Sequence, residues 1–229
     1  MFGLLQPVMF LLLFRYILGA AIRMPAGREY VDYLLAGVFV QTIAMNAVAS
    51  GIGHAEDRQL GVADRLRSLP VRRMAAALGR VLATLVHNAF AAVVLLVVGL
   101  AIGFSPGGDL WTWLAAAALL AAFSFTCAWI GVIVGETSPT PEAAQAAGFV
   151  LLFPLVIAST AFVPAFALPD GVREFVEQQP LSRIMDAERA LMLGDPAGSE
   201  LWIALAWCAA ILAGAVWLAR RLLEREAAA

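Results

Sequence analysis

The stretch VLATLVHNAFAAVVLLVVGLAIGFSPGG, residues 81–108, decides the fold class because it carries no formal charge between Arg80 and Asp109. About 20 consecutive apolar residues are enough for a helix to cross a lipid bilayer. Further charge-free runs of sufficient length lie at 33–55, 110–135, 143–169 and 201–219. Another run begins at Met1 and becomes long enough by continuing past Arg15 to Ile22. The sequence therefore predicts an all-α integral membrane protein with six transmembrane helices, near 1–22, 33–53, 80–103, 111–135, 144–167 and 200–219.

The composition excludes a soluble domain. Of the 229 residues, 62% are hydrophobic and 14% are charged, whereas a soluble domain is about half apolar and about a quarter charged. All 15 basic residues are arginine, which excludes chemistry that needs a lysine, such as a Schiff base. Cys127 and Cys208 lie within apolar runs, and we expect buried thiols rather than a disulfide or a metal site. A net charge of −2 argues against a nucleic acid partner.

A cleaved signal peptide is the alternative for the first apolar run. Such a peptide needs basic residues before its apolar core. None occur in MFGLLQP, residues 1–7, and Arg15 interrupts the core. We therefore interpret this run as a span.

The arginines predict the orientation of the chain. With a cytoplasmic N-terminus, the cytoplasmic segments hold nine arginines and the outer segments hold five. Positive charge accumulates in the cytoplasmic loops of membrane proteins. We expect a multi-pass protein of the plasma membrane with both termini and the 54–79 loop in the cytoplasm, and with residues 168–198 outside.

The loop HAEDRQLGVADRLRSLP, residues 54–70, has the pattern of a short amphipathic helix between spans two and three. Val62, Leu66 and Leu69 recur at helical spacing, charges of both signs surround them, and Pro70 ends the segment. Such a helix can anchor passively at the membrane or dock on a cytoplasmic partner. Anionic headgroups repel its acidic residues, which favours a protein partner.

The segment 168–198 predicts two further short helices, near 169–180 and 181–194, with Gly194 as the C-terminal stop of the second. Neither is long or apolar enough to span. We expect interfacial or partly re-entrant helices on the outer face, and an ordinary pair of amphipathic loop helices is the alternative.

Polar side chains within the spans are candidates for a substrate path or for hydrogen bonds between helices. For Thr42, Ser50 and Thr84 the second interpretation is favoured. The candidates for a substrate path are Arg15, Gln41, Asn46 and Ser159. No catalytic cluster and no metal-ligand spacing occurs in the sequence, so we expect a transport subunit rather than an enzyme.

The stretch DRQLGVADRLRSLP, residues 57–70, followed by Gly79-Arg80, resembles the permeases of ABC-2 type exporters, and most closely their daunorubicin-resistance branch. Residues 13–16 and 33–37 match the early region of that branch, and Pro154, Ser159, 161–164 and Pro180 match the region after the fourth span. Members usually carry a cytoplasmic amphipathic helix before the first span, whereas here the apolar run opens at Met1.

The resemblance implies one transmembrane domain, 1–229, that works as a homodimer or heterodimer with a second permease copy. It implies that residues 54–70 form a coupling helix that docks on a separate ABC ATPase, which binds ATP and Mg. Lacking the lysine of a P-loop, this chain could not hydrolyse ATP by that route. The residues expected to carry the contact are Glu56, Asp57, Arg58, Gly61, Asp64, Arg65, Arg67 and Pro70.

The function expected from this resemblance is ATP-driven export of an amphipathic drug-like or lipid-linked compound. A secondary carrier independent of an ATPase is the alternative, and it would need acidic residues within the spans, where none occur. An intramembrane enzyme is disfavoured because the sequence has no catalytic cluster.

Overall fold

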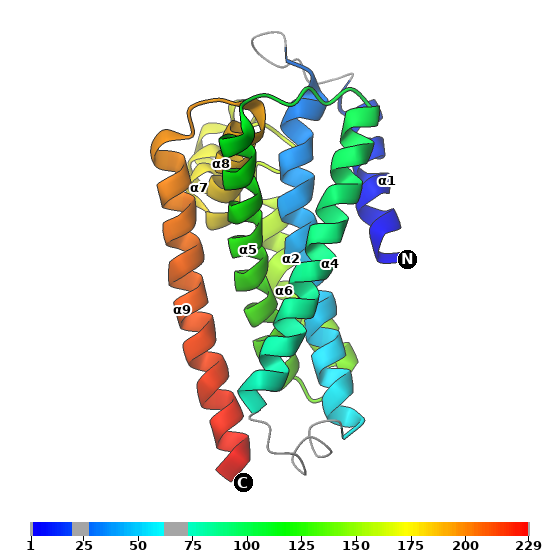
Figure 1. Cartoon of the computed structure of the whole chain (residues 1–229), viewed down its shortest axis with the longest axis vertical. Coiled ribbons are helices and arrows are strands. Elements are labelled where there is room, and N and C mark those ends of the chain that lie inside the picture. Colours follow the sequence, from blue (N-terminus) through cyan, green and yellow to red (C-terminus); the bar gives the residue numbers. More distant parts are fainter. Residues whose placement is uncertain (1, 20–27, 62–72, 229) are drawn as a thin grey trace. The chain divides into compact units, whose positions relative to one another are not determined.

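The computed structural model describes residues 2–19, 28–61 and 73–228, and all regular structure within these ranges is helical. Figure 1 shows the elements in chain order. They are α1 (Phe2–Ile17), α2 (Tyr30–Gln59), α4 (Arg73–Ala101), α5 (Leu110–Thr137), α6 (Pro141–Ile157), the 3-10 turn η2 (Ala165–Ala167), α7 (Asp170–Gln178), α8 (Pro180–Leu193) and α9 (Gly198–Ala228).

Four helices in the described ranges are long and apolar enough to cross a membrane, which makes this a multi-pass membrane protein. They lie within α2, α4, α5 and α9, where spans two, three, four and six are predicted. The helices at the other two predicted spans are apolar but shorter: α1 has 16 residues and α6 has 17. The six-span count therefore stays a prediction. The predicted end of the first span, at residue 22, lies outside the described residues.

The fifth predicted span, near 144–167, is helical only in part, because α6 ends at Ile157 rather than near residue 167. At the break, the side chain of Ser159 takes the place of helical backbone hydrogen bonds. Its hydroxyl donates to the carbonyl of Val156 at 2.5 Å and accepts from the amide of Ala161 at 3.2 Å. Pro164, which has no N–H to donate, follows a few residues later. The apolar composition of 158–167 hides this break.

The chain folds into two compact units, each built from segments distant in sequence. The first unit comprises Met1–Thr42, Ala89–Ala121 and Leu155–Trp207. The second comprises Ile43–Asn88, Ala122–Pro154 and Cys208–Ala229.

In the first unit, side chains from α2 and α8 bond the backbone exposed by the break in α6. Tyr33 donates its hydroxyl to the carbonyl of Thr160 at 2.5 Å, and Tyr30 donates to Phe162 at 2.5 Å. Arg189 Nη2 also donates to the carbonyl of Thr160, at 3.1 Å, and its guanidinium stacks 3.7 Å from the Tyr33 ring centroid. Non-helical backbone is tolerated at membrane depth only when protein satisfies it in this way.

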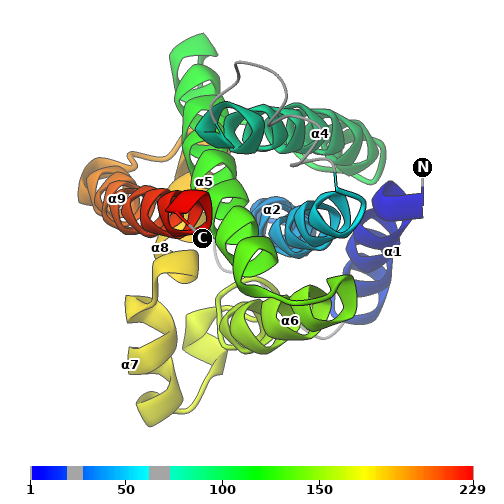
Figure 2. The same cartoon turned by 90° about the horizontal axis from the view of Figure 1, so that it is seen from below.

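The two short helices predicted between residues 168 and 198 are present as α7 and α8, and they pack against each other (Figure 2). Gly194 ends α8 with a left-handed φ of 72°, as its position in the sequence predicts. Ile184, Ala187 and Leu191 lie on the buried face of α8.

Glu188 is also on the buried face of α8, and the sequence analysis overlooked it. It is 1% exposed, and its Oε2 has no hydrogen-bond partner among the described residues. Burial raises the pKa of the Glu188 carboxyl well above its usual range, which favours the protonated, neutral form.

The second unit has an apolar core of small and large side chains from α4, α5 and α9, among them Val81, Trp129, Val132 and Leu223. Helices α2 and α5 approach closely along a line of small residues. A Cβ at Gly131 would lie 2.5 Å from the Ala47 carbonyl oxygen, and one at Gly135 would lie 2.5 Å from that of Gly51. Glycines four residues apart are a common device for such contacts between membrane helices.

Gly37 on α2 should be sensitive to the smallest substitution, because a Cβ there would lie 2.2 Å from the Ala161 carbonyl oxygen. Gly37→Ala should displace the broken segment and cost about 1–3 kcal/mol, as overpacking does. Gly214→Ala is the matched control, since no atom lies within 4 Å of a Cβ there. Thermal unfolding in detergent should show a lower midpoint for Gly37→Ala alone. Equal midpoints would contradict the close contact.

Candidate functional site

The segment predicted to form a separate coupling helix begins as the last turns of α2. Residues 54–59 continue this helix without interruption, because no glycine or proline lies between Gly53 and Leu60. The helix ends before Gly61, whose φ is 67°. The predicted contact residues Asp64, Arg65, Arg67 and Pro70, and the stripe Val62, Leu66 and Leu69, lie outside the described residues. Glu56, Asp57 and Arg58 thus sit on α2 itself.

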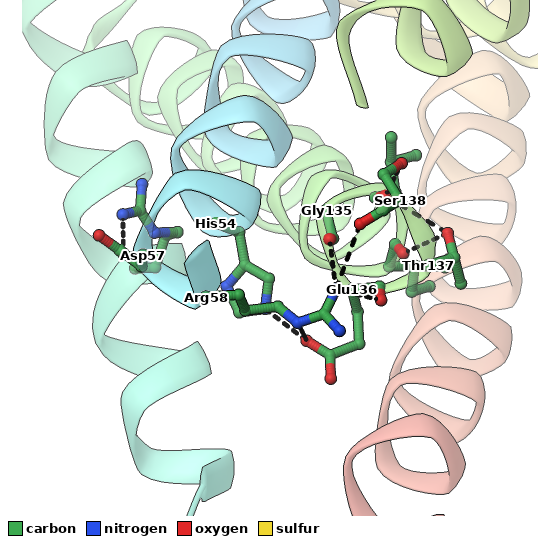
Figure 3. Close-up of polar contacts among 10 residues, drawn as sticks. His54, Asp57, Arg58, Gly135, Glu136, Thr137 and Ser138 are labelled. Atoms are coloured by element: carbon green, nitrogen blue, oxygen red, sulfur yellow. Dashed lines mark hydrogen bonds and ion pairs between the residues drawn. The ribbon is translucent and has the colours of Figure 1, made fainter. Parts of the chain in front are cut away.

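Arg58 caps the C-terminal end of α5 within the second unit (Figure 3). Its Nη1 lies 3.2 Å from the Gly135 carbonyl oxygen, 2.7 Å from that of Glu136 and 3.3 Å from that of Ser138. The last carbonyls of a helix have no partner within the helix and carry partial negative charge. A guanidinium from α2 therefore binds the end of α5 both by hydrogen bonds and by charge.

His54 binds the same end of α5 through the side chain of Glu136. His54 Nε2 and Glu136 Oε2 are 2.7 Å apart, and the Glu136 side chain is 5% exposed. Arg58 Nε lies 3.9 Å from the same carboxylate oxygen. Gly135 makes the contact possible, since a Cβ there would lie 2.7 Å from His54 Cβ. Two consecutive turns of α2 are thus fixed to one carboxylate.

Asp57 points from α2 toward α4, where it forms an ion pair with Arg80. Gly53 provides the space, because a Cβ there would lie 2.5 Å from Arg80 Nη1. Among the predicted contact residues, Asp57 and Arg58 therefore have partners within this chain. Glu56 differs from them: it is exposed and forms no ion pair with the described residues.

A partly open cavity of about 630 Å³ lies between α2 and α4 in the second unit. Both helices contribute polar and small side chains to its walls. The lining residues are Asn46, Ala49, Ser50, His54, Asp57, Arg58, Ala76, Gly79, Arg80, Ala83, Thr84 and His87.

Hydrogen bonds between helices link the polar residues next to this cavity. Asn46 donates to Asn88 Oδ1 at 2.7 Å, and Asn88 donates to Ser124 Oγ at 2.7 Å. Thr84 Oγ1 lies 3.1 Å from Ser50 Oγ. These contacts agree with the helix-to-helix interpretation of Ser50 and Thr84. Asn46 bonds Asn88 through its side-chain amide and also lines the cavity.

The remaining candidates for a substrate path lie in the first unit. Arg15 forms an ion pair with Glu29, and Ser159 is only 5% exposed and bonds its own backbone. Gln41 is partly buried on α2. Asn46 belongs to the second unit.

Glu136 and the contact between glycines escaped the sequence analysis. In the sequence, Glu136 only marks the end of the charge-free run 110–135, and no pattern links it to His54. The pair Gly131 and Gly135 was readable, because its spacing of four residues on an apolar helix is a known packing motif.

The fold and site define a polytopic membrane protein, helical throughout the regular structure of its described residues, in which the charged end of α2 is bonded to the end of α5. The family model described as ABC-2 type transporter matches residues 1–193. The chain belongs to this family. It is the membrane subunit of an ABC exporter, and the family implies an ATPase partner.

Relatives agree with this assignment. The chain is 30% identical over 222 residues to a daunorubicin resistance ABC transporter permease protein of Streptomyces coeruleorubidus, covering 97% of this chain and 78% of the relative. It is 25% identical over 220 residues to a probable doxorubicin resistance ABC transporter permease protein of Mycobacterium tuberculosis, covering 91% of this chain and 75% of the relative. The alternative of a secondary carrier is not favoured.

Replacing Arg58 should destabilise the second unit. Arg58→Gln removes the donors from three carbonyls, and losing charged hydrogen bonds of this kind costs about 2 kcal/mol. Arg173→Gln is the control, because the exposed pair Arg173–Glu177 should contribute only about 0–1 kcal/mol. Thermal unfolding in detergent measures both effects. Similar midpoints for the two variants would show that Arg58 does not stabilise the end of α5.

Proposed function

We propose that this permease exports an amphipathic drug-like or lipid-linked compound across the plasma membrane, powered by ATP and Mg on a separate ABC ATPase. The relatives named for daunorubicin and doxorubicin resistance support this substrate class. A second permease copy, identical or related, completes the transporter. Asn46 lines the cavity between α2 and α4, which supports its assignment to the substrate path.

We further propose six crossings with both termini cytoplasmic. As helices, α1 and α6 extend about 24–26 Å, somewhat less than a hydrocarbon core of about 30 Å. The bonded segment after Ile157 would complete the fifth crossing, because its carbonyls already have protein donors. α7 and α8 would then lie at the outer surface.

The end of α2 is the proposed coupling element. The observation that carries this proposal is the set of bonds from Arg58 to the carbonyls at the end of α5. An ATPase that displaces the end of α2 would move α5 as well, because the guanidinium and the pair His54–Glu136 join the two helices. ATP binding would thus shift the permease between conformations.

Charge reversal on this segment should weaken the ATPase contact. Glu56→Arg, Asp64→Arg and Arg65→Glu should each reduce co-purification of the ATPase while leaving membrane insertion unchanged, because no span is altered. Losing one member of an interfacial charge pair costs roughly 2–5 kcal/mol when the pair is desolvated. Pull-down of the ATPase and an export assay, with each variant alone, provide the measurement.

Two variants separate docking from the internal ion pair. Asp57→Arg and Arg80→Gln both break the pair between α2 and α4, but only the first changes the proposed docking surface. A loss of co-purification with Asp57→Arg and not with Arg80→Gln supports docking at Asp57. If all the charge reversals bind and export like the wild type, the segment is only a membrane anchor and the coupling proposal is wrong.

The orientation predicts opposite accessibility for two exposed residues. Leu60, 72% exposed at the end of α2, should be protected from a membrane-impermeant thiol reagent in intact cells, and Phe175, 60% exposed on α7, should react. Leu60→Cys and Phe175→Cys are each made in a background without Cys127 and Cys208. Labelling at position 60 in intact cells would refute the orientation.

A further inference from the structure

The cavity of the second unit is an elongated slot. Its wall on α2 runs from Asn46 to Arg58, a distance of about 18 Å along a helix. Its wall on α4 runs from Ala76 to His87 in the opposite sense, because Thr84 faces Ser50 and Arg80 faces Asp57. The residues on each wall recur every three or four positions, so each wall is a single helix face.

The two ends of the slot differ in polarity. Asp57, Arg58 and Arg80 lie together at one end, whereas the lining toward Asn46 and His87 carries no formal carboxylate or guanidinium. Ala49 and Ala83 line the stretch between these ends, together with the bonded pair Ser50 and Thr84, whereas Ala76 and Gly79 precede Arg80 on α4 and lie toward the charged end. A site with a charged end and an uncharged, alanine-lined body is complementary to an amphiphile.

Guanidinium groups outnumber carboxylates among the lining side chains. Two guanidiniums, Arg58 and Arg80, line the slot together with a single carboxylate, Asp57. Glu136 is 5% exposed, is bonded to His54, and is not among the lining residues. The balance of charge in the wall therefore favours a negatively charged group.

Arg80 has N–H donors that could bind such a group. Its ion pair with Asp57 uses Nη2, and Nη1 and Nε make no hydrogen bond with the described residues. The Arg80 side chain is 28% exposed, so a molecule in the slot can reach it. Asp57 and the glycine backbone at position 53 fix the guanidinium in place, which lowers the entropic cost of binding.

We propose that the slot between α2 and α4 binds an amphiphile through an anionic headgroup, a phosphate or a carboxylate, at Arg80. The apolar body extends along Ala83 and Ala49 toward Asn46. If the orientation proposed above is correct, the charged end lies at the level of the cytoplasmic headgroups, where an inner-leaflet lipid or an amphiphile awaiting export could enter.

The test measures binding to the purified full-length permease in mild detergent by native mass spectrometry. The probe is dioleoyl-phosphatidylglycerol, with dioleoyl-phosphatidylcholine, dodecanoate and inorganic phosphate as comparisons. Wild type should retain phosphatidylglycerol at concentrations that leave no phosphatidylcholine bound. Arg80→Gln should weaken this binding by about tenfold or more, because it removes the charged donor.

A second variant blocks the slot without changing any charge. A Cβ at Gly79 would meet no atom within 4 Å, so Gly79→Leu places its side chain in the open cavity. Gly214→Leu is the matched control, since position 214 on α9 is equally open and does not line the slot. Gly79→Leu should weaken phosphatidylglycerol binding as Arg80→Gln does, and Gly214→Leu should bind like the wild type.

The comparison probes distinguish the sources of the ligand. Competition by dodecanoate would support a site for anionic amphiphiles in general, and its failure would support a bilayer phospholipid. Equal retention of phosphatidylcholine, displacement by inorganic phosphate as effective as by dodecanoate, or unchanged binding in both slot variants would overturn the proposal. The assay contains no ATPase, so its result is independent of the coupling and export experiments.

Discussion

Neither a lipid bilayer nor a packed protein interior offers water to a peptide group, so each buried backbone group at the end of a helix needs a partner from the protein. In the first unit, the carbonyls released where α6 ends are bonded by Tyr30, Tyr33 and Arg189. In the second unit, the carbonyls at the end of α5 are bonded by Arg58. In both units the donor comes from a different helix, so satisfying one helix end also fixes which helices are neighbours.

The same constraint places the charged side chains. Arg189 is only 12% exposed and lies against Asp186, and Glu136 lies between His54 and Arg58. Buried charges need partners because desolvation penalises the ionised form strongly. Glu188 is the contrasting case: burial raises the pKa of its carboxyl, and a neutral acid avoids most of that penalty. Arg189 and Glu136 thus have charged partners, whereas burial favours the neutral form of Glu188.

The sequence predicts those features that depend on composition over a long run. α2, α4, α5 and α9 follow from charge-free stretches, and α8 with its stop at Gly194 follows from local pattern. The early end of α6 does not follow, because residues 158–167 are mostly apolar and the side chains that donate to the Thr160 carbonyl, Tyr33 and Arg189, lie more than 20 residues away on other elements. For the same reason the bond between Arg58 and α5 is invisible in the sequence, which shows only a charged loop.

The exclusive use of arginine has a structural explanation where arginines bind the backbone. Arg58 contacts three carbonyl oxygens and a carboxylate at once, and Arg189 contacts the carbonyls of Tyr33 and Thr160 while stacking on a ring. A planar guanidinium has five donors in a fixed fork and remains charged, whereas an ammonium is a compact point charge that loses its proton more readily when desolvated. Lysine could neutralise either site, but its single nitrogen could not replace the two nitrogens that each arginine uses. Nη1 of Arg58 contacts the carbonyls while its Nε faces the carboxylate, and Nε and Nη2 of Arg189 each bond a different carbonyl. The exclusive use of arginine thus suits the way the broken and terminated helices of this chain are stabilised.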